Sequence, residues 1–276
     1  MKKKIAFIDM DGTLLHSRYY VSDTNLEMLK KASKNVEIVI ATGRSIADCL
    51  FVLERCPFIR YIVASNGALV KDLKENKFIF ESKMDIEDLI SLSKYVKRNK
   101  LKLSIHNDMI QYVNELGELP EKADTLLKED LVDFVSKNDI TQVVMIGSGI
   151  ERMIRAKKYV LKNKNVIIQN QSIQLKKYMK ENVIIPSDEP LYYFMDITNT
   201  NVDKGVGILK LSEYLGYDKK DIIAIGNGMN DVPMFEVAGC AAVVENALAE
   251  IKKHGDVIID SNTNDGVGKY LVTLVK

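Results

Sequence analysis

Four short apolar runs in this sequence each end in a cluster of polar residues and glycines, and this pattern constrains the fold strongly. The runs are continuous and do not alternate with polar residues, which is typical of parallel strands buried on both faces. Segments with helical spacing lie between or after them, such as Ser22–Ser33 and Gly205–Tyr214. Strand–helix alternation predicts a doubly wound, Rossmann-like parallel sheet. The runs are Ile5–Ile8, Val36–Ala41, Tyr61–Ala64 and Ile222–Ile225, and Ala241–Val244 and Val257–Ile259 are further predicted strands.

The polar clusters are expected at one edge of the sheet, because the carboxyl ends of parallel strands lie on the same side. Asp9 and Asp11 follow the first run, Thr42 follows the second and Asn66 follows the third. The fourth run leads into the loop Gly226–Asp231. Residues more than 200 positions apart should therefore share one cleft. Glycines in these loops allow tight turns and expose backbone N–H groups, which suit an anionic ligand.

The middle of the chain, residues 82–195, indicates a second α/β unit inserted into the first. We expect residues 1–81 and 196–276 to form the sheet domain, with the insertion as a separate cap domain. Helices are predicted at Ile86–Lys97 and Glu151–Lys162, and strands at Leu101–His106, Met109–Val113, Gln142–Ile146 and Leu191–Ile197.

The chemistry of the polar cluster points to a cation and a phosphate. Three aspartates, Asp9, Asp11 and Asp231, would repel one another in one cleft unless they were protonated or neutralised by a cation. Oxygen-only ligands select a hard cation, for which Mg²⁺ is the usual choice, and the cluster offers no thiol or imidazole for zinc. Lys204 and Thr42 are candidates for contacts with phosphate oxygens.

Composition argues against several classes of function. The net charge is +1, and basic residues are scattered among acidic ones, so no nucleic-acid or membrane partner is expected. No apolar stretch approaches the roughly 20 residues of a membrane span. The three cysteines form no C-x-x-C pair, which fits a reduced chain. We expect a cytoplasmic protein, monomeric or weakly homo-oligomeric, that binds a small molecule.

Four stretches in this order resemble the motifs of the haloacid-dehalogenase (HAD) superfamily phosphatases. Asp9–Leu15 (DMDGTLL) resembles motif one and Thr42–Arg44 (TGR) resembles motif two. Lys204-Gly205 resembles motif three, and Gly226–Asp231 (GNGMND) resembles motif four. Too few residues separate the first two motifs to hold a cap, so the insertion falls between the third strand and motif three. That position resembles the C2-capped, Cof-type branch, subfamily IIB.

The resemblance implies a Mg²⁺-dependent phosphatase for a small phosphorylated metabolite, such as a sugar phosphate. Asp9 would be the nucleophile that forms an aspartyl-phosphate, and Asp11 would protonate the leaving alcohol and then deprotonate water. Thr42 and Lys204 would hold the transferring phosphoryl group. The implied metal ligands are Asp9, Asp11, Asn227 and Asp231, and the implied substrate or phosphate contacts are Gly12, Thr13, Gly43, Arg44, Asn66 and Asn230.

One residue departs from the family pattern, which commonly has Asp where this chain has Asn227. An amide oxygen can ligate Mg²⁺ but lacks the negative charge, so Asp231 would take a larger share of the metal, or Asn230 would orient it. Asp231, two residues before Pro233, is also a candidate helix cap. Two alternative functions remain open: phosphoryl transfer of the phosphohexomutase type, and a non-catalytic metabolite-binding module on a HAD core.

Overall fold

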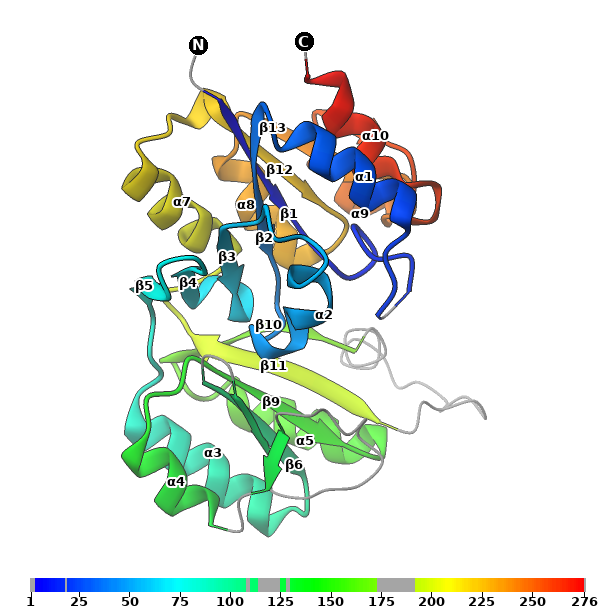
Figure 1. The fold of residues 1–276 in the computed structure, drawn as a ribbon. Coiled ribbons are helices and arrows are strands. Elements are labelled where there is room, and N and C mark those ends of the chain that lie inside the picture. Colours follow the sequence, from blue (N-terminus) through cyan, green and yellow to red (C-terminus); the bar gives the residue numbers. More distant parts are fainter. Residues whose placement is uncertain are drawn as a thin grey trace. The chain divides into compact units, whose positions relative to one another are not determined.

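The computed structural model describes residues 3–17, 19–107, 110–113, 125–127, 130–172 and 192–275. The chain forms two compact units (Figure 1). The core unit comprises Met1–Glu81 and Val202–Lys276, and the inserted unit comprises Ser82–Asn201. The chain returns to the core unit after Asn201, where the sequence prediction placed the return after Met195, because the last strand of the inserted unit continues to Asn199.

The core unit contains one eight-stranded sheet. Its strands are β1 (Lys4–Ile8), β2 (Val36–Ala41), β3 (Tyr61–Ala64), β4 (Leu69–Asp72), β5 (Lys77–Glu81), β12 (Ile222–Gly226), β13 (Cys240–Val244) and β14 (Val257–Ile259). The strand order is β14-β13-β12-β1-β2-β3-β4-β5. All strand pairs from β14 to β3 are parallel, whereas β4 and β5 add an antiparallel edge. This arrangement confirms the predicted doubly wound fold.

Helices cover both faces of this sheet. They are α1 (Asp23–Ala32), α2 (Leu50–Leu53), α7 (Lys204–Leu215), α8 (Val232–Val237), α9 (Ala249–Lys252) and α10 (Gly266–Thr273). Helices α1 and α10 pack against each other on one face, and α7 and α8 pack against each other on the other (Figure 1). Short 3₁₀ turns connect several elements: Ala47–Cys49, Ser65–Gly67, Lys219–Asp221, Met229–Asp231 and Asn262–Asn264.

The inserted unit has its own sheet and its own core. Its strands are β6 (Lys102–Asn107), β7 (Ile110–Val113), β8 (Thr125–Leu127), β9 (Gln142–Gly147), β10 (Val166–Gln171) and β11 (Tyr193–Asn199), in the order β10-β11-β9-β6-β7-β8. Its helices are α3 (Ile86–Arg98), α4 (Leu131–Lys137) and α5 (Ile150–Val160). Buried side chains from these helices and strands form one hydrophobic cluster that includes Leu92, Met145 and Ile197. Met109 and Leu191, where two predicted strands begin, lie outside the described residues.

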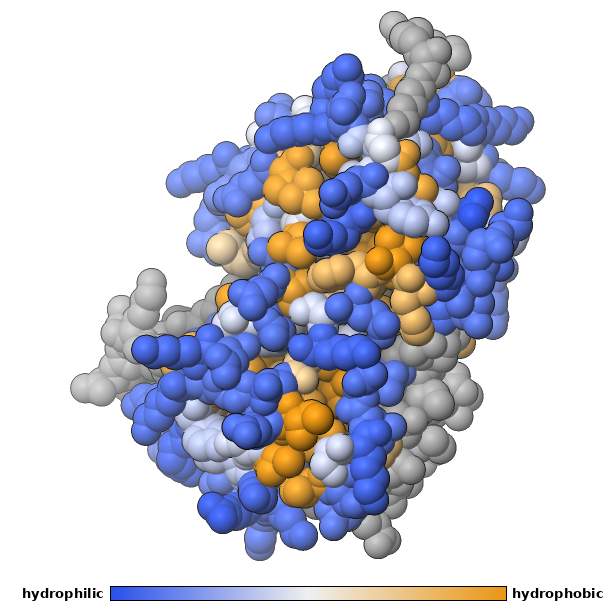
Figure 2. All heavy atoms as spheres, turned by 90° about the vertical axis from the view of Figure 1, so that its left-hand side faces the viewer, coloured by the Kyte–Doolittle hydropathy of each residue, from blue (hydrophilic) through white to orange (hydrophobic). Residues whose placement is uncertain are grey.

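The visible surface is mostly hydrophilic. On the face shown in Figure 2, hydrophobic atoms form separate patches among polar side chains. Within the described ranges, no helix has the length and apolar character needed to cross a membrane.

Candidate functional site

Except for Lys204, which begins α7, the predicted site residues follow the carboxyl ends of four neighbouring strands, β12, β1, β2 and β3. The parallel register aligns these ends, with Ile8 opposite both Ile225 and Ile40. The polar loops therefore begin at one edge of the sheet, at the position where the chain reverses its direction of winding. Hydrogen bonds link these residues in two groups. One group comprises Asp9, Lys204, Asp231 and Asn227, and the other comprises Asp11, Arg44, Thr42, Asn66 and Asn230. Gly12 lies close to Asn227, and Gly43 lies close to Asn66.

Lys204 joins the first loop to the last. It is the first residue of α7, and the side chain of Asp203 caps this helix by accepting a hydrogen bond from Val206 N at 2.8 Å. Lys204 Nζ lies 2.6 Å from Asp9 Oδ1 and 2.6 Å from Asp231 Oδ1, and its side chain is fully buried. Burial alone would lower the pKa of Lys204, but the charges of Asp231 and Asp9 raise it. The ammonium group therefore stays charged.

Asp9 is a perturbed carboxylate. Burial and the charge of Asp231 raise the pKa of Asp9 from its ordinary value of 3.8 to about 7, and Lys204 offsets only part of this effect. The single positive charge of Lys204 faces two buried carboxylates. This part of the site therefore carries negative charge that a further cation would neutralise.

Asp231 organises the loop after β12. Its Oδ2 accepts hydrogen bonds from the backbone N–H groups of Asn227 and Gly228, both at 2.8 Å. Asp231 stands at the N-cap position of α8, but its side chain makes no capping hydrogen bond to that helix. The predicted cap position is therefore confirmed, but the carboxylate turns back to the preceding loop and to Lys204.

The loops after β2 and β3 are joined by hydrogen bonds. Asn66 N donates to the Thr42 carbonyl oxygen at 3.0 Å, and Asn230 Nδ2 donates to Asn66 Oδ1 at 3.0 Å. A Cβ atom at Gly43 would lie 3.0 Å from the Asn66 amide. Ser65 and Asn66 are both buried and both left-handed, with φ of 51° and 52°. Two consecutive non-glycine residues in this region concentrate backbone strain beside the site.

Gly67 allows the loop after β3 to lie closer to the turn before α7 than a side chain would permit. It has φ of 92°, and a Cβ atom there would lie 1.9 Å from the carbonyl oxygen of Asp203. The loop after β3 therefore sits directly on the turn that starts α7. Because that turn carries Lys204, the two halves of the core unit meet at the charged centre of the site.

Arg44 pairs with Asp11. Its Nε and Nη2 atoms donate to the two carboxylate oxygens of Asp11 at 2.7 and 2.5 Å, which is the bidentate geometry of a guanidinium–carboxylate pair. The guanidinium lies 5.2 Å from the ring centre of Tyr19 and 5.6 Å from that of Phe51. Arg44, predicted as a substrate or phosphate contact, thus holds the second aspartate of motif one, and its own position is fixed by two aromatic rings.

The loop after Asp11 lies against the loop after β12. Gly12 has φ of 74°, and a Cβ atom there would lie 2.3 Å from Asn227 Nδ2. Thr13 is fully buried, and within the described residues its Oγ1 has no hydrogen-bond partner.

Sequence reasoning missed three residues that support this site. Asp203 fixes the start of α7, and Tyr19 and Phe51 bracket Arg44. An aspartate two residues before a glycine at the start of an apolar helical pattern could have identified the first as an N-cap. No local signal identifies the aromatic pair, because Tyr19 and Phe51 meet only in the folded chain, at 5.4 Å between ring centres.

Comparison with known proteins extends these observations to the whole chain. A family model described as haloacid dehalogenase-like hydrolase matches residues 6–271. The chain is 27% identical to the 5-amino-6-(5-phospho-D-ribitylamino)uracil phosphatase YcsE of Bacillus subtilis, over 97% of this chain and 94% of that protein. The crystal structure of TM0651 from Thermotoga maritima is 25% identical, with a TM-score of 0.76 and coverage of 98% and 97%.

A more distant structure has the same fold with its insertion. BT4131, described as a HAD subclass IIB sugar phosphatase, has a TM-score of 0.75 at 19% identity and covers 99% of both chains. The family match spans both segments of the core unit and the insertion between them. The chain therefore belongs to the haloacid dehalogenase-like hydrolases and is one of their phosphatases, and its fold with the inserted unit matches that of a subclass IIB member.

Proposed function

We propose that this phosphatase is Mg²⁺-dependent and hydrolyses a small phosphomonoester through an aspartyl-phosphate intermediate on Asp9. The observation that carries the proposal is the position of Asp9 at the end of β1. One oxygen of its carboxylate is held by Lys204. The other, Oδ2, makes no hydrogen bond to the described part of the chain. The carboxylate is thus fixed by one oxygen and open at the other, which suits a nucleophile.

In the first step, an Asp9 oxygen attacks the phosphorus atom while the bond to the leaving oxygen breaks. Asp11, protonated once it has left its ion pair with Arg44, supplies a proton to that oxygen, so the product leaves as an alcohol. Lys204 keeps positive charge beside the nucleophile. Thr42 Oγ1 accepts a hydrogen bond from Arg44 N at 3.2 Å, which leaves the hydroxyl proton of Thr42 for a phosphoryl oxygen.

In the second step, water attacks the phosphorus atom of the aspartyl-phosphate. Asp11, now ionised, accepts a proton from the water as the new bond forms. The bond between the Asp9 oxygen and phosphorus breaks, which regenerates the carboxylate and releases inorganic phosphate. The same residue thus serves first as acid and then as base.

The residues of the site suit a hard divalent cation. No group of three His, Cys, Asp or Glu side chains among the described residues has a metal-binding arrangement. Oxygen donors of other kinds are nevertheless present. The Asp9 carboxylate, the Asp11 carbonyl and the Asn227 amide would hold Mg²⁺, and Asp231, whose two oxygens are engaged by Lys204 and by backbone N–H groups, would orient the loop. Bound Mg²⁺ would neutralise charge on the phosphate and on Asp9.

The names of the relatives support a substrate class. YcsE acts on a phosphorylated ribityl chain and BT4131 is described as a sugar phosphatase. Both descriptions name a phosphate ester of a sugar or a sugar-derived chain. We therefore propose a sugar phosphate or a related phosphomonoester for this chain.

The test is a phosphate-release screen of phosphorylated sugars, nucleotides and cofactor precursors, with Mg²⁺ and with EDTA. We expect Mg²⁺-dependent release that the Asp9→Asn variant lacks although its circular dichroism spectrum matches the wild type. Phosphate release by a well-folded Asp9→Asn variant would contradict the mechanism. Conversion of a hexose 1-phosphate into its 6-phosphate isomer, without release, would favour the mutase alternative.

A further inference from the structure

Three asparagine side chains from outside the four motifs hold the backbone of the motif-one loop. Asn246 Nδ2 donates to the carbonyl oxygen of Gly12 at 2.8 Å, and Asn262 Nδ2 donates to that of Leu15 at 2.7 Å. Asn25 Nδ2 reaches the carbonyl oxygen of Leu14 at a longer 3.5 Å. These carbonyls belong to the residues directly after Asp11.

The two shorter contacts are coupled. Asn262 N donates to Asn246 Oδ1 at 3.0 Å, so the backbone of Asn262 helps to orient the Asn246 side chain. Asn246 follows β13 and Asn262 follows β14, the two outermost strands on that side of the sheet. The loop that carries Asp11 is therefore fastened to elements more than 230 residues away in the sequence.

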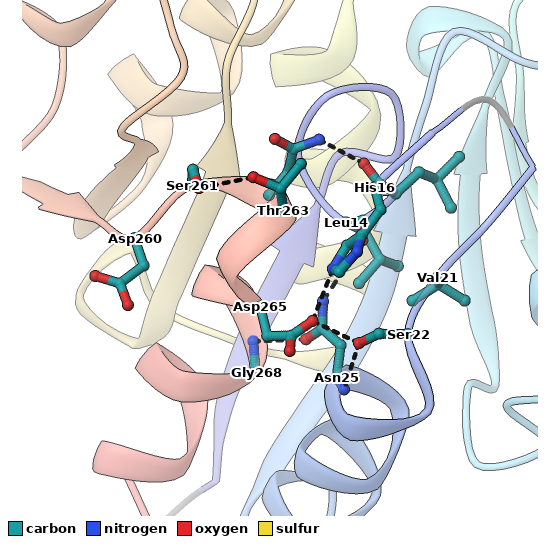
Figure 3. Close-up of polar contacts among 12 residues, drawn as sticks. Leu14, His16, Val21, Ser22, Asn25, Asp260, Ser261, Thr263, Asp265 and Gly268 are labelled. Carbon is teal, nitrogen blue, oxygen red and sulfur yellow. Dashed lines mark hydrogen bonds and ion pairs between the residues drawn. The ribbon is translucent and has the colours of Figure 1, made fainter.

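A second set of contacts fastens the far end of the same loop (Figure 3). Asp265 Oδ1 lies 2.7 Å from His16 Nε2 and accepts a hydrogen bond from Ser22 Oγ at 2.5 Å. The Ser22 hydroxyl in turn accepts from Asn25 N at 2.9 Å and caps α1. Gly268 N donates to Asn25 Oδ1 at 2.9 Å. Asp265, before α10, thus contacts His16 at the end of the loop, and Asp265 and Gly268 contact the start of α1.

The interior of the loop is a tight turn that transmits these contacts to Asp11. Leu14 N and Leu15 N both donate to the carbonyl oxygen of Met10, at 3.1 and 2.9 Å. Asp11 lies between Met10 and the left-handed Gly12, so its position depends on the peptide planes on both sides. A displaced Gly12 carbonyl would rotate the peptide plane close to Asp11.

We propose that Asn246 and Asn262 are positioning residues for Asp11, which they hold through the loop backbone without contact with the substrate. This inference rests on the proposed function, in which Asp11 protonates the leaving oxygen. Protonation matters most for a weakly acidic leaving alcohol or phenol. Loss of the asparagines should therefore slow reactions that need the proton more than reactions that do not.

The experiment compares two esters of similar shape. Phenyl phosphate releases a weakly acidic phenol, whereas p-nitrophenyl phosphate releases an anion that is stable without a proton. The value of kcat/KM is measured with Mg²⁺ for both esters, because it reports steps up to departure of the leaving group. The variants are Asn246→Ala and Asn262→Ala, with Asp11→Asn as the reference for loss of the acid. Asn264→Ala is the matched control, since this exposed asparagine of the same segment makes no described side-chain hydrogen bond.

For Asn246→Ala and Asn262→Ala we expect kcat/KM to fall about tenfold on phenyl phosphate and about threefold or less on p-nitrophenyl phosphate, as for one or two lost hydrogen bonds. Asn264→Ala should match the wild type on both esters. Hydrogen exchange of backbone amides in residues 10–16 should be faster in Asn246→Ala and Asn262→Ala than in the wild type, and unchanged in Asn264→Ala.

Equal slowing of both esters in the asparagine variants, with a clear difference in Asp11→Asn, would overturn the inference and leave the proposed function intact. Equal slowing in Asp11→Asn would instead contradict the acid role of Asp11. Unchanged hydrogen exchange over residues 10–16 in both asparagine variants would overturn the inference whatever the activity, because the asparagines would then not restrain the loop.

Discussion

At the scale of single residues, the charge balance around Lys204 dominates the site. The buried ammonium group of Lys204 pairs with two buried carboxylates, those of Asp9 and Asp231. Burial and the charge of Asp231 raise the pKa of Asp9 to about 7. A carboxylate in this state is costly to ionise without a further cation. Ionised Asp9 therefore destabilises the metal-free site, and a bound divalent ion would offset this destabilisation.

This cost predicts how the stability of the metal-free protein depends on pH. Between its ordinary pKa of 3.8 and about 7, Asp9 holds a proton in the folded state that the unfolded state has released. The free energy of unfolding should therefore fall as pH rises through this window. Asp9→Asn removes the ionisation, so in EDTA it should be more stable than the wild type at pH 8 by on the order of 1–3 kcal/mol.

Thermal unfolding of both proteins in EDTA from pH 5 to pH 8 tests this expectation. The difference in Tm should widen with pH and shrink when Mg²⁺ stabilises the wild type. Parallel Tm curves across the range would show that Asp9 is not held in a destabilising environment.

Arg44 offers a second test at this scale. Arg44 pairs with the ionised form of Asp11, which accepts the water proton in the second step and is needed for every substrate. Arg44→Lys should therefore lower kcat about tenfold and leave KM within about twofold, since a lysine cannot reproduce the bidentate pair. Steady-state kinetics on p-nitrophenyl phosphate and on a sugar phosphate give both constants. A large rise in KM with unchanged kcat would assign Arg44 to substrate binding instead.

The motifs predicted which loops meet, but not how their side chains pair. Asp9, Lys204 and Asp231 were expected in one cleft because each stands at a strand end or a helix start, and these positions are set by local patterns. The pairing of Arg44 with Asp11 and the contacts of Asn246 and Asn262 depend on long-range packing. In sequence, those asparagines resemble ordinary turn residues.

At the scale of elements, the buried parallel strands were predicted within a residue or two because they are short continuous apolar runs. The antiparallel edge formed by β4 and β5 was not predicted. Its strand β4 ends in two buried charged residues, Lys71, which lies over the Phe78 ring, and Asp72, which pairs with Arg60. Those partners come from other elements, so no local apolar pattern marks the strand.

The meeting of the β3 loop with α7 gives a prediction for Gly67. Gly67→Ala must place a Cβ atom against the Asp203 carbonyl, whereas Gly149, also left-handed at φ of 79°, has open space around its Cα. Both substitutions incur the penalty of a positive φ, about 1 kcal/mol. Gly67→Ala should therefore cost at least 2 kcal/mol more than Gly149→Ala.

Urea unfolding of the two variants measures this difference, and far-ultraviolet circular dichroism checks that both fold. Gly67→Ala should also lower phosphatase activity, because the shifted turn carries Lys204. Equal destabilisation by the two substitutions would mean that the loop after β3 does not rest on α7.

At the scale of the whole molecule, each unit has its own hydrophobic core. The cluster of the inserted unit contains only residues from Met84 to Ile197, and the site contacts described above lie in the core unit. Replacement of residues 82–201 by a flexible glycine–serine linker should therefore leave a folded core that hydrolyses p-nitrophenyl phosphate. Its kcat/KM values should differ little among phosphorylated sugars. Failure of this chain to fold, seen by circular dichroism, would show that the core depends on the insertion.

The strand order also has a consequence for synthesis on the ribosome. β1 lies between β2, which is made within about 40 residues, and β12, which is made more than 200 residues later. One edge of an apolar central strand therefore stays unpaired while most of the chain is translated. During that interval the nascent protein exposes a surface prone to aggregation, and chaperones that bind extended apolar segments would act on it. The candidate site is completed only when residues 204–231 have emerged.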